Sequence, residues 1–300
     1  MARAPMTALS WPSDGRDWPN HAASRFLSAG GLRWHVQVMG AGPVLLLLHG
    51  TGASTHSWRD LGPMLATDFT VVAPDLPGHG FTQSPHSDQL SLPAMARAIA
   101  TLLKALDLAP DLVVGHSAGA AIGLRMALDG SIAPNVLISL NGALLPFRGV
   151  AAQLFPSLAR LLVLNPFVPR LFAWRAGSAG AVDSLLRGTG SKLDQRGLDL
   201  YQRLFSNRVH VAATLAMMAN WDLEVLGRAF GKLDLPVVLA VAANDKAVPP
   251  GDAAEVARRL PNARIETIPA AGHLAHEEKP DEIAALIRRV AKEHIALASG

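Results

Sequence analysis

One serine of the chain lies in a pattern that is typical of a nucleophile. Residues 115–119 read Gly-His-Ser-Ala-Gly, which places Ser117 two residues from a glycine on either side. An apolar run precedes this segment at 112–114, and a run of mostly small residues follows it at 120–128. This order predicts a strand, a sharp turn and a helix. A serine on such a turn has a strained backbone conformation and an accessible hydroxyl. The alternative is a glycine-rich turn in which the serine is incidental.

A serine hydroxyl is a poor nucleophile at neutral pH unless a base removes its proton. Among the 11 histidines, His273 is the preferred base. It lies in a loop between the strand-like segment 264–268 and the last helical segment, which would place it at the carboxyl edge of a sheet. His276 is the rival candidate, and we expect it to face solvent or the last helix.

A third group must hold the histidine in the tautomer that can accept a proton, and a carboxylate suits this role. Asp245 follows the apolar run at 237–241, in a loop that ends at Pro249. The end of the preceding strand, where a carboxylate could also serve, reads Ser-Leu-Asn-Gly at 139–142. Asp245 is therefore the candidate acid. The alternative is that it forms a turn beside Asn244.

Acyl transfer also needs N–H groups directed at the negative charge that develops on the substrate oxygen. The turn itself would supply the backbone N–H of Ala118. The loop at 49–52, which reads His-Gly-Thr-Gly after an apolar run, would supply that of Thr51. We expect His49 to brace this loop by hydrogen bonding rather than to take part in catalysis.

Other polar clusters favour structural roles. Residues 75–80 read Asp-Leu-Pro-Gly-His-Gly, which is typical of a tight turn, and His79 is not expected to be catalytic. His56, Trp58 and Arg59 could line the entrance to the site, or Ser57 could cap the next helix. The sequence has no phosphate-binding loop, dinucleotide fingerprint, His-Glu-x-x-His motif or calcium loop. We therefore expect neither a cofactor nor a metal.

Apolar runs of strand length recur along the chain, at 44–48, 69–73, 112–114, 136–140 and 237–241, mostly with helical patterns between them. This alternation predicts an α/β fold with a mostly parallel, doubly wound sheet. The rhythm breaks between 142 and 221, which we interpret as a helical lid inserted between two strands. The predicted organisation is a polar N-terminal arm at 1–24, a core at 25–141 and 222–300, and the lid at 142–221.

The lid segment combines apolar and basic side chains. Its large apolar residues indicate a bulky, apolar small molecule as the substrate, and they are Leu154, Phe155, Leu161, Leu162, Phe167, Phe172 and Trp174. Four arginines could meet carboxylate groups of a ligand or a membrane surface, and they are Arg148, Arg160, Arg170 and Arg175. The alternative is an amphipathic helix pair whose arginines are solvated.

The composition narrows the partners and the compartment. The 300 residues carry a formal net charge of +3, and 17% of them are charged, which does not indicate a nucleic acid partner. The absence of cysteine excludes disulfides and favours the cytoplasm. No apolar run approaches the roughly 20 residues that a membrane-spanning helix needs, so any membrane contact is expected to be peripheral.

These motifs together resemble the α/β-hydrolase superfamily over about residues 25–295, and the order serine, acid, histidine is that of its fold. At finer grain, residues 17–20, 29–37, 49–59 and 115–121 look like those of the magnesium-chelatase accessory proteins of bacteriochlorophyll synthesis. The chain departs from the superfamily at Ala242, where the acid loop often has glycine. An α/β-hydrolase fold with a lid is therefore expected.

The resemblance implies an accessory role in photosynthesis, in the insertion of magnesium into protoporphyrin IX beside the ATP-driven magnesium-chelatase subunits, which are the implied partners. One expectation is a serine hydrolase that acts on an ester or amide of a bulky apolar molecule, and a tetrapyrrole ester would fit. The alternative is a non-catalytic porphyrin-binding or delivery protein, or a scaffold for the chelatase. Haloalkane or peroxide chemistry on the same fold is less favoured, because dehalogenation uses an aspartate nucleophile and position 117 is serine.

Overall fold

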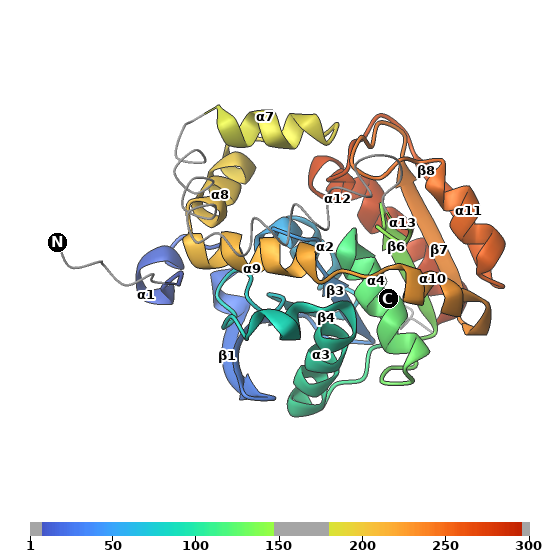
Figure 1. The fold of residues 1–300 in the computed structure, drawn as a ribbon, viewed down its shortest axis with the longest axis horizontal. Coiled ribbons are helices and arrows are strands. Elements are labelled where there is room, and N and C mark those ends of the chain that lie inside the picture. The colour runs from blue at the N-terminus through green and yellow to red at the C-terminus, as the bar shows by residue number, and fades with distance from the viewer. Residues whose placement is uncertain (1–7, 147–179, 296–300) are drawn as a thin grey trace.

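The computed structural model describes residues 8–146 and 180–295, and an eight-stranded sheet forms its centre (Figure 1). The strand order is β1-β2-β4-β3-β5-β6-β7-β8. Two antiparallel pairings join β1 (Ser24–Ala29), β2 (Leu32–Met39) and β4 (Thr70–Pro74). All other pairings are parallel, and they involve β4, β3 (Val44–Leu48), β5 (Leu112–His116), β6 (Val136–Leu140), β7 (Val237–Ala242) and β8 (Ala263–Ile268).

The predicted α/β architecture with a mostly parallel sheet is confirmed. Each of the five apolar runs forms a strand, and the strand-like segment 264–268 lies within β8. The hairpin of β1 and β2 was not predicted from the sequence. β1 lies at the edge of the sheet, and of its six residues Ala29 alone is fully buried, so it carries no continuous apolar run.

Helices cover both faces of the sheet and enclose two hydrophobic cores. The first core is covered by α3 (Leu92–Leu106), α4 (Ala118–Leu128), α10 (Glu224–Ala229) and α11 (Asp252–Arg259). The second is covered by α2 (Leu61–Leu65), α12 (Ala275–Glu278) and α13 (Pro280–His294). Leu46 and Leu48 of β3 point into the first core, whereas Leu45 and Leu47 point into the second. Because side chains alternate along a strand, burial on both faces makes such a strand apolar throughout.

After β6, the described residues form α7 (Ala181–Gly188), α8 (Gln195–Phe205) and α9 (Arg208–Ala219), and α10 follows them before β7. We refer to residues 181–219 as the helical insert. In Figure 1 its helices lie above β3 and β4, and α9 is the one nearest to these strands. The insert therefore lies on the side of the sheet from which several of the predicted site residues come.

The N-terminal residues pack against the core and the insert, although their composition suggested a polar arm. α1 (Trp11–Asp14) lies beside α8 (Figure 1). Trp18 is buried with Phe81, Leu200 and Leu204. Its indole N–H donates to Thr55 Oγ1 at 3.0 Å. The described part of the arm is thus a structural element of the fold.

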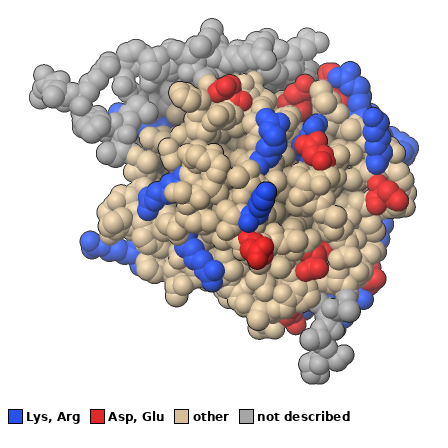
Figure 2. All heavy atoms as spheres, turned by 90° about the horizontal axis from the view of Figure 1, so that it is seen from below, with Lys and Arg blue, Asp and Glu red and all other residues tan. Residues whose placement is uncertain are grey.

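The surface carries charges of both signs. On the face drawn in Figure 2, most lysine and arginine side chains lie singly, and acidic side chains lie among them on part of that face. None of the helices in the described ranges is both long enough and apolar enough to cross a membrane.

Candidate active site

Ser117 lies between the end of β5 and the start of α4, on a sharp turn. Its backbone has φ 51° and ψ −116°, a combination that costs a non-glycine residue energy and that often marks a functional position. Its N–H donates to the carbonyl oxygen of Leu140 at the end of β6, at 3.0 Å. Within the described residues the Ser117 hydroxyl has no hydrogen-bond partner.

The glycines that flank this turn are required by close backbone packing. A β-carbon at Gly115 would lie 2.4 Å from the backbone nitrogen of Ala120. One at Gly119 would lie 2.1 Å from the carbonyl oxygen of Leu48. Since real side chains do not approach so closely, the Gly-x-Ser-x-Gly pattern permits β5, α4 and β3 to crowd around Ser117.

The structure brings His273 and Asp245 into direct contact. The loop after β8 holds His273 and the loop after β7 holds Asp245, and His273 Nδ1 lies 2.8 Å from Asp245 Oδ2. The other carboxylate oxygen, Oδ1, accepts hydrogen bonds from the N–H groups of Ala247 (2.8 Å) and Val248 (2.9 Å). Asp245 therefore orients the imidazole and also forms the turn that was considered as its alternative role.

Two side chains connect the His273 loop to the strands beside Ser117. His116, which precedes Ser117, has its Nε2 2.9 Å from the carbonyl oxygen of His273. Asn141, at the end of β6, donates through Nδ2 to the carbonyl oxygens of His273 (2.8 Å) and Gly272 (3.2 Å). Its Oδ1 accepts from the N–H of Ala242 at 2.7 Å. In the sequence, the end of β6 stood out because it lacks a carboxylate. In the structure, the Asn141 amide at this position holds the His273 loop in place.

The loop at 49–52 approaches Ser117 from the end of β3. A β-carbon at Gly50 would lie 3.1 Å from the Ser117 β-carbon. The predicted bracing role of His49 is confirmed, because its Nε2 accepts from the Leu76 N–H at 2.9 Å and its Nδ1 lies 2.8 Å from the Gly50 carbonyl oxygen. Burial lowers the pKa of His49, which keeps the ring neutral as these bonds require.

Asp75 organises the turn at 75–80 from within. Its Oδ2 is 2.7 Å from His35 Nδ1 and accepts from the Phe81 N–H at 2.8 Å, and its Oδ1 accepts from the Thr55 N–H at 2.7 Å. Its pKa is lowered because the attraction of His35 and these hydrogen bonds outweigh the effect of burial. This fully buried carboxylate was interpreted from the sequence as a turn residue, and its links to two further segments were not predicted.

His276 was expected to face solvent or the last helix, and the first of these alternatives was wrong. His276 is 1% exposed and packs between the rings of Trp58 and His116, at centroid distances of 4.6 and 4.4 Å. Burial lowers its pKa to about 3, so it remains neutral at physiological pH. The contact that His273 makes with Asp245 favours His273 over His276 as the base.

A short segment after α7 touches both of the loops that hold Asp245 and His273, the candidate acid and base. The carbonyl oxygen of Thr189 accepts from the Lys246 N–H at 3.0 Å and from the His273 N–H at 3.4 Å. Ser191 Oγ accepts from the Leu274 N–H at 2.8 Å. Between them, a β-carbon at Gly190 would lie 2.1 Å from the carbonyl oxygen of Asn244, so this close approach requires glycine. In the sequence these residues lie within the lid predicted at 142–221, and no role was predicted for them.

A buried polar network connects α8 to the core nearby. Arg59 forms an ion pair with Glu277, and the Tyr201 hydroxyl donates to the other Glu277 oxygen at 2.8 Å. Arg59 also contacts Asp194, the N-cap of α8, at 3.1 Å. Burial raises the pKa of Glu277 to about 7, although Arg59 and Tyr201 act in the opposite direction. Arg59 therefore fastens the insert rather than lining an open entrance.

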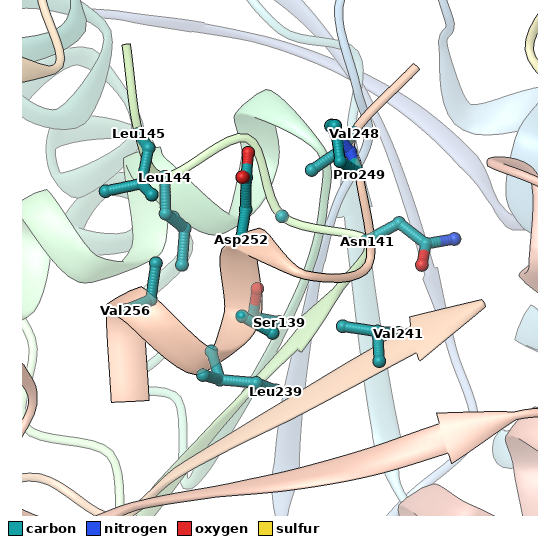
Figure 3. Close-up of a pocket in the computed structure, with 12 residues that line it drawn as sticks. Ser139, Asn141, Leu144, Leu145, Leu239, Val241, Val248, Pro249, Asp252 and Val256 are labelled. Carbon is teal, nitrogen blue, oxygen red and sulfur yellow. The ribbon is translucent and has the colours of Figure 1, made fainter. Parts of the chain in front are cut away.

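A small cavity lies on the other side of Asn141, between β6, β7 and α11 (Figure 3). Its volume of about 20 Å³ suits roughly one water molecule and is too small for a bulky substrate. In Figure 3 the Asn141 amide points away from the other lining side chains. The apolar and basic residues at 148–175 that predicted a bulky ligand lie outside the described residues. In the described ranges no group of three or more His, Asp or Glu could hold a metal ion.

Comparison with known proteins gives four informative likenesses. A family model described as the alpha/beta hydrolase fold matches residues 43–280. The chain is 40% identical to the "Magnesium-chelatase 30 kDa subunit" of Rhodobacter capsulatus, over 90% of this chain and 95% of that one. It is 29% identical to the pyrrolizixenacetamide deacetylase of Xenorhabdus hominickii, over 83% and 91%. The crystal structure of an alpha/beta hydrolase fold protein from Burkholderia ambifaria matches with a TM-score of 0.73 at 25% identity, over 88% and 97%.

Proposed function

The chain belongs to the α/β-hydrolase family, and from this membership we propose that it is a serine hydrolase that serves as an accessory protein of magnesium chelation. The observation that carries the hydrolase part is the 2.8 Å contact between His273 Nδ1 and Asp245 Oδ2, formed at the same sheet edge as the strained turn of Ser117. The name of the Rhodobacter capsulatus relative supports the accessory part.

In the proposed reaction, Ser117 Oγ attacks the carbonyl carbon of an ester or amide. As the new C–O bond forms, the hydroxyl proton moves to His273 Nε2 and the carbonyl electron pair moves to the oxygen. The backbone N–H groups of Thr51 and Ala118 stabilise that negative charge. Asp245 stays ionised and keeps the proton on His273 Nδ1, which leaves Nε2 free to accept.

The intermediate then breaks its bond to the leaving group, which takes the proton from His273 as an alcohol or amine. The acyl group remains on Ser117. Water attacks this ester while His273 removes its proton, and the acid product leaves as the proton returns to Ser117 Oγ. The complete cycle returns Ser117 and His273 to their starting state, so the proposed reaction needs no cofactor.

A bulky apolar substrate is the class we propose. The loop at 49–52 contacts apolar parts of the insert: a β-carbon at Gly52 would lie 3.4 Å from the Phe205 ring and 3.5 Å from the Thr214 methyl, and Thr51 Oγ1 lies 3.8 Å from the Met217 sulfur. Within the proposed pathway, an ester of a porphyrin would suit such surroundings, and the magnesium-chelatase subunits would be the partners.

The hydrolase proposal is tested with a fluorophosphonate probe, which forms a covalent bond with an activated serine. We expect the wild type and a Ser28→Ala control, at an exposed position of β1, to be labelled at the same rate. Ser117→Ala should not be labelled. Equal labelling of Ser117→Ala and the wild type, or no labelling of either, would contradict the proposal.

A non-catalytic function as a porphyrin-binding, delivery or scaffold protein is the second candidate. It is favoured by the name of the Rhodobacter capsulatus relative, which refers to the chelatase and not to hydrolysis. Pigment formation in cells that carry the wild type, Ser117→Ala or a deletion separates the two. Loss of pigment in both altered strains supports the hydrolase, whereas loss on deletion alone supports the non-catalytic function.

A further inference from the structure

His210, in the first turn of α9, connects the helical insert to two loops of the core. It is 2% exposed, and its two ring nitrogens contact different partners. Nε2 lies 3.0 Å from the carbonyl oxygen of Gly52, and Nδ1 lies 3.2 Å from the Gly80 nitrogen. Because the Gly80 N–H can only donate, Nδ1 must accept, and the proton of the neutral ring is on Nε2. The Nε2–H then donates to Gly52.

The ring is held in place before any ligand arrives. Asn207, the N-cap of α9, accepts through Oδ1 from the N–H groups of Val209 (3.0 Å) and His210 (3.1 Å), which fixes the first turn. The His79 ring packs edge-on against His210 at a centroid distance of 5.2 Å. Burial lowers the pKa of His210 to about 4, so at pH 7 the ring is in the neutral form that both contacts need.

The acceptor of His210 is next to a residue of the proposed reaction. Gly52 follows Thr51, whose N–H would bind the substrate oxygen, and Gly52 has φ +78°. The turn is closed by a hydrogen bond from the Ala53 N–H to the Gly50 carbonyl oxygen at 3.2 Å. The hydrogen bond from His210 adds a restraint on the rotation of the Gly52 carbonyl. On the other side of Thr51, His49 restrains Gly50 at 2.8 Å. The two histidines thus hold the loop at both ends.

We propose that His210 is a positioning residue that holds the loop at 49–52 so that the Thr51 N–H faces the developing oxyanion. This role rests on the proposed hydrolase function and deepens it. A residue of the insert would hold in place the loop whose N–H group stabilises the transition state. Complete loss of one N–H donor to the oxyanion lowers the reaction rate by about 10² to 10³-fold. We expect a loosened loop to lower the reaction rate by at least about tenfold.

Three substitutions separate the two hydrogen bonds. His210→Gln can place its amide nitrogen near the position of Nε2 and keep the bond to Gly52. His210→Asn can place its amide oxygen near the position of Nδ1 and keep the bond to Gly80, but it does not reach Gly52. His210→Leu removes both. His86→Leu, at an exposed histidine, is the matched control.

The first measurement is the rate of fluorophosphonate labelling at equal protein concentration. We expect His210→Asn and His210→Leu to be labelled at least about tenfold more slowly than the wild type, and His210→Gln and His86→Leu within about threefold of it. If His210→Asn is labelled as fast as His210→Gln, the proposed role is wrong.

The second measurement does not depend on hydrolysis. Amide hydrogen exchange of residues 50–54 should become faster in His210→Asn and His210→Leu and stay near the wild-type rate in His210→Gln. Unchanged exchange in all variants overturns the inference, whether or not the wild type is labelled. If the wild type is not labelled but the exchange pattern is as expected, the hydrolase proposal fails while the positioning of the loop by His210 stands.

Discussion

Asp245 shows how one side chain can perform two tasks that the sequence presented as alternatives. Oδ2 faces His273, while Oδ1 closes the turn through the N–H groups of Ala247 and Val248. A substitution that keeps one task and removes the other is therefore informative.

Asp245→Asn is such a substitution. Its amide oxygen can still accept from the two N–H groups, but its NH₂ group would face His273 Nδ1 and force the proton onto Nε2. Nε2 could then no longer accept from Ser117, so we expect labelling by the fluorophosphonate to fall by about 10⁴-fold, with the free energy of unfolding changed by less than about 1 kcal/mol. Labelling kinetics and urea unfolding measure the two quantities. A variant that is labelled at the wild-type rate would exclude the assigned role.

Asn141→Asp is the second test at this scale. Aspartate tolerates the positive φ of 46° found at this position, and it keeps the acceptor for the Ala242 N–H. It cannot donate to the carbonyl oxygens of His273 and Gly272, and its charge repels them. We expect a loss of about 1 to 3 kcal/mol in the free energy of unfolding and at least about tenfold slower labelling. Asn135→Asp, at an exposed position, should change neither.

For single residues, the position of a candidate site residue was predictable where a motif constrains the residue types. The side chains that it packs against or bonds to were not predictable. The turn of Ser117 could be recognised in the sequence by its glycines, which are required because backbone crowding leaves no room for side chains. His276 gave no such signal. Its burial between Trp58 and His116 depends on how α12 packs, and a histidine that is buried without a hydrogen-bond partner among the described residues looks the same in sequence as an exposed one.

At the scale of elements, the N-terminal arm fastens α8. Trp18 packs with Leu200 and Leu204, and Arg203 of α8 makes two 2.8 Å contacts with the Asp17 carboxylate. The arm therefore attaches to the insert through apolar packing and through polar contacts of Arg203, which also donates to the carbonyl oxygen of Asp14 at 2.7 Å. The apolar packing and the Asp17–Arg203 ion pair differ greatly in expected strength.

Trp18→Ala removes the apolar contact and leaves the Thr55 hydroxyl without its donor. We expect a loss of about 3 to 5 kcal/mol in the free energy of unfolding, together with faster proteolysis within α8. Asp17→Ala, which removes an exposed ion pair, should cost less than about 1 kcal/mol. Urea unfolding and limited proteolysis of both variants test this order, and equal costs would contradict it.

The elements themselves were predictable to different degrees. Strands buried on both faces, such as β3, were evident as apolar runs, because packing against two cores requires apolar side chains throughout. The β1–β2 hairpin was not, since an edge strand is apolar on part of one face only. The segment 189–191 owes its position to contacts with loops more than 50 residues away in sequence, for which a local pattern gives no indication.

Across the whole molecule, eight histidines are buried. Burial lowers the pKa of six of them, which are His49, His56, His79, His116, His210 and His276. In the unfolded chain these groups bind protons near pH 6.5, whereas the folded chain resists protonation. Below pH 6.5 the unfolded state therefore binds more protons, and stability must fall as the pH falls.

The free energy of unfolding should consequently decrease steeply between pH 6.5 and pH 4. The lowering of the His210 pKa from 6.5 to about 4 alone corresponds to about 3 kcal/mol over this interval. Glu277 acts in the opposite direction, because its raised pKa of about 7 favours the folded state as the pH falls towards 4.5, but it is one group against six. Urea midpoints at pH 7.5, 6.5, 5.5 and 4.5 measure the balance, and a midpoint that does not fall would contradict it.

The contacts of Thr189, Gly190 and Ser191 with the loops of Asp245 and His273 bear on how relatives of this protein can diversify. An insert that merely covered a site could be exchanged between relatives to alter substrate choice while the chemistry stayed intact. Here a chimera joined at the ends of β6 and β7 would also remove the backbone partners of the acid and base loops. For the proposed hydrolase, selectivity and turnover are therefore expected to be inherited together, and a chimera that keeps the native residues through Ser191 is the one that should retain both.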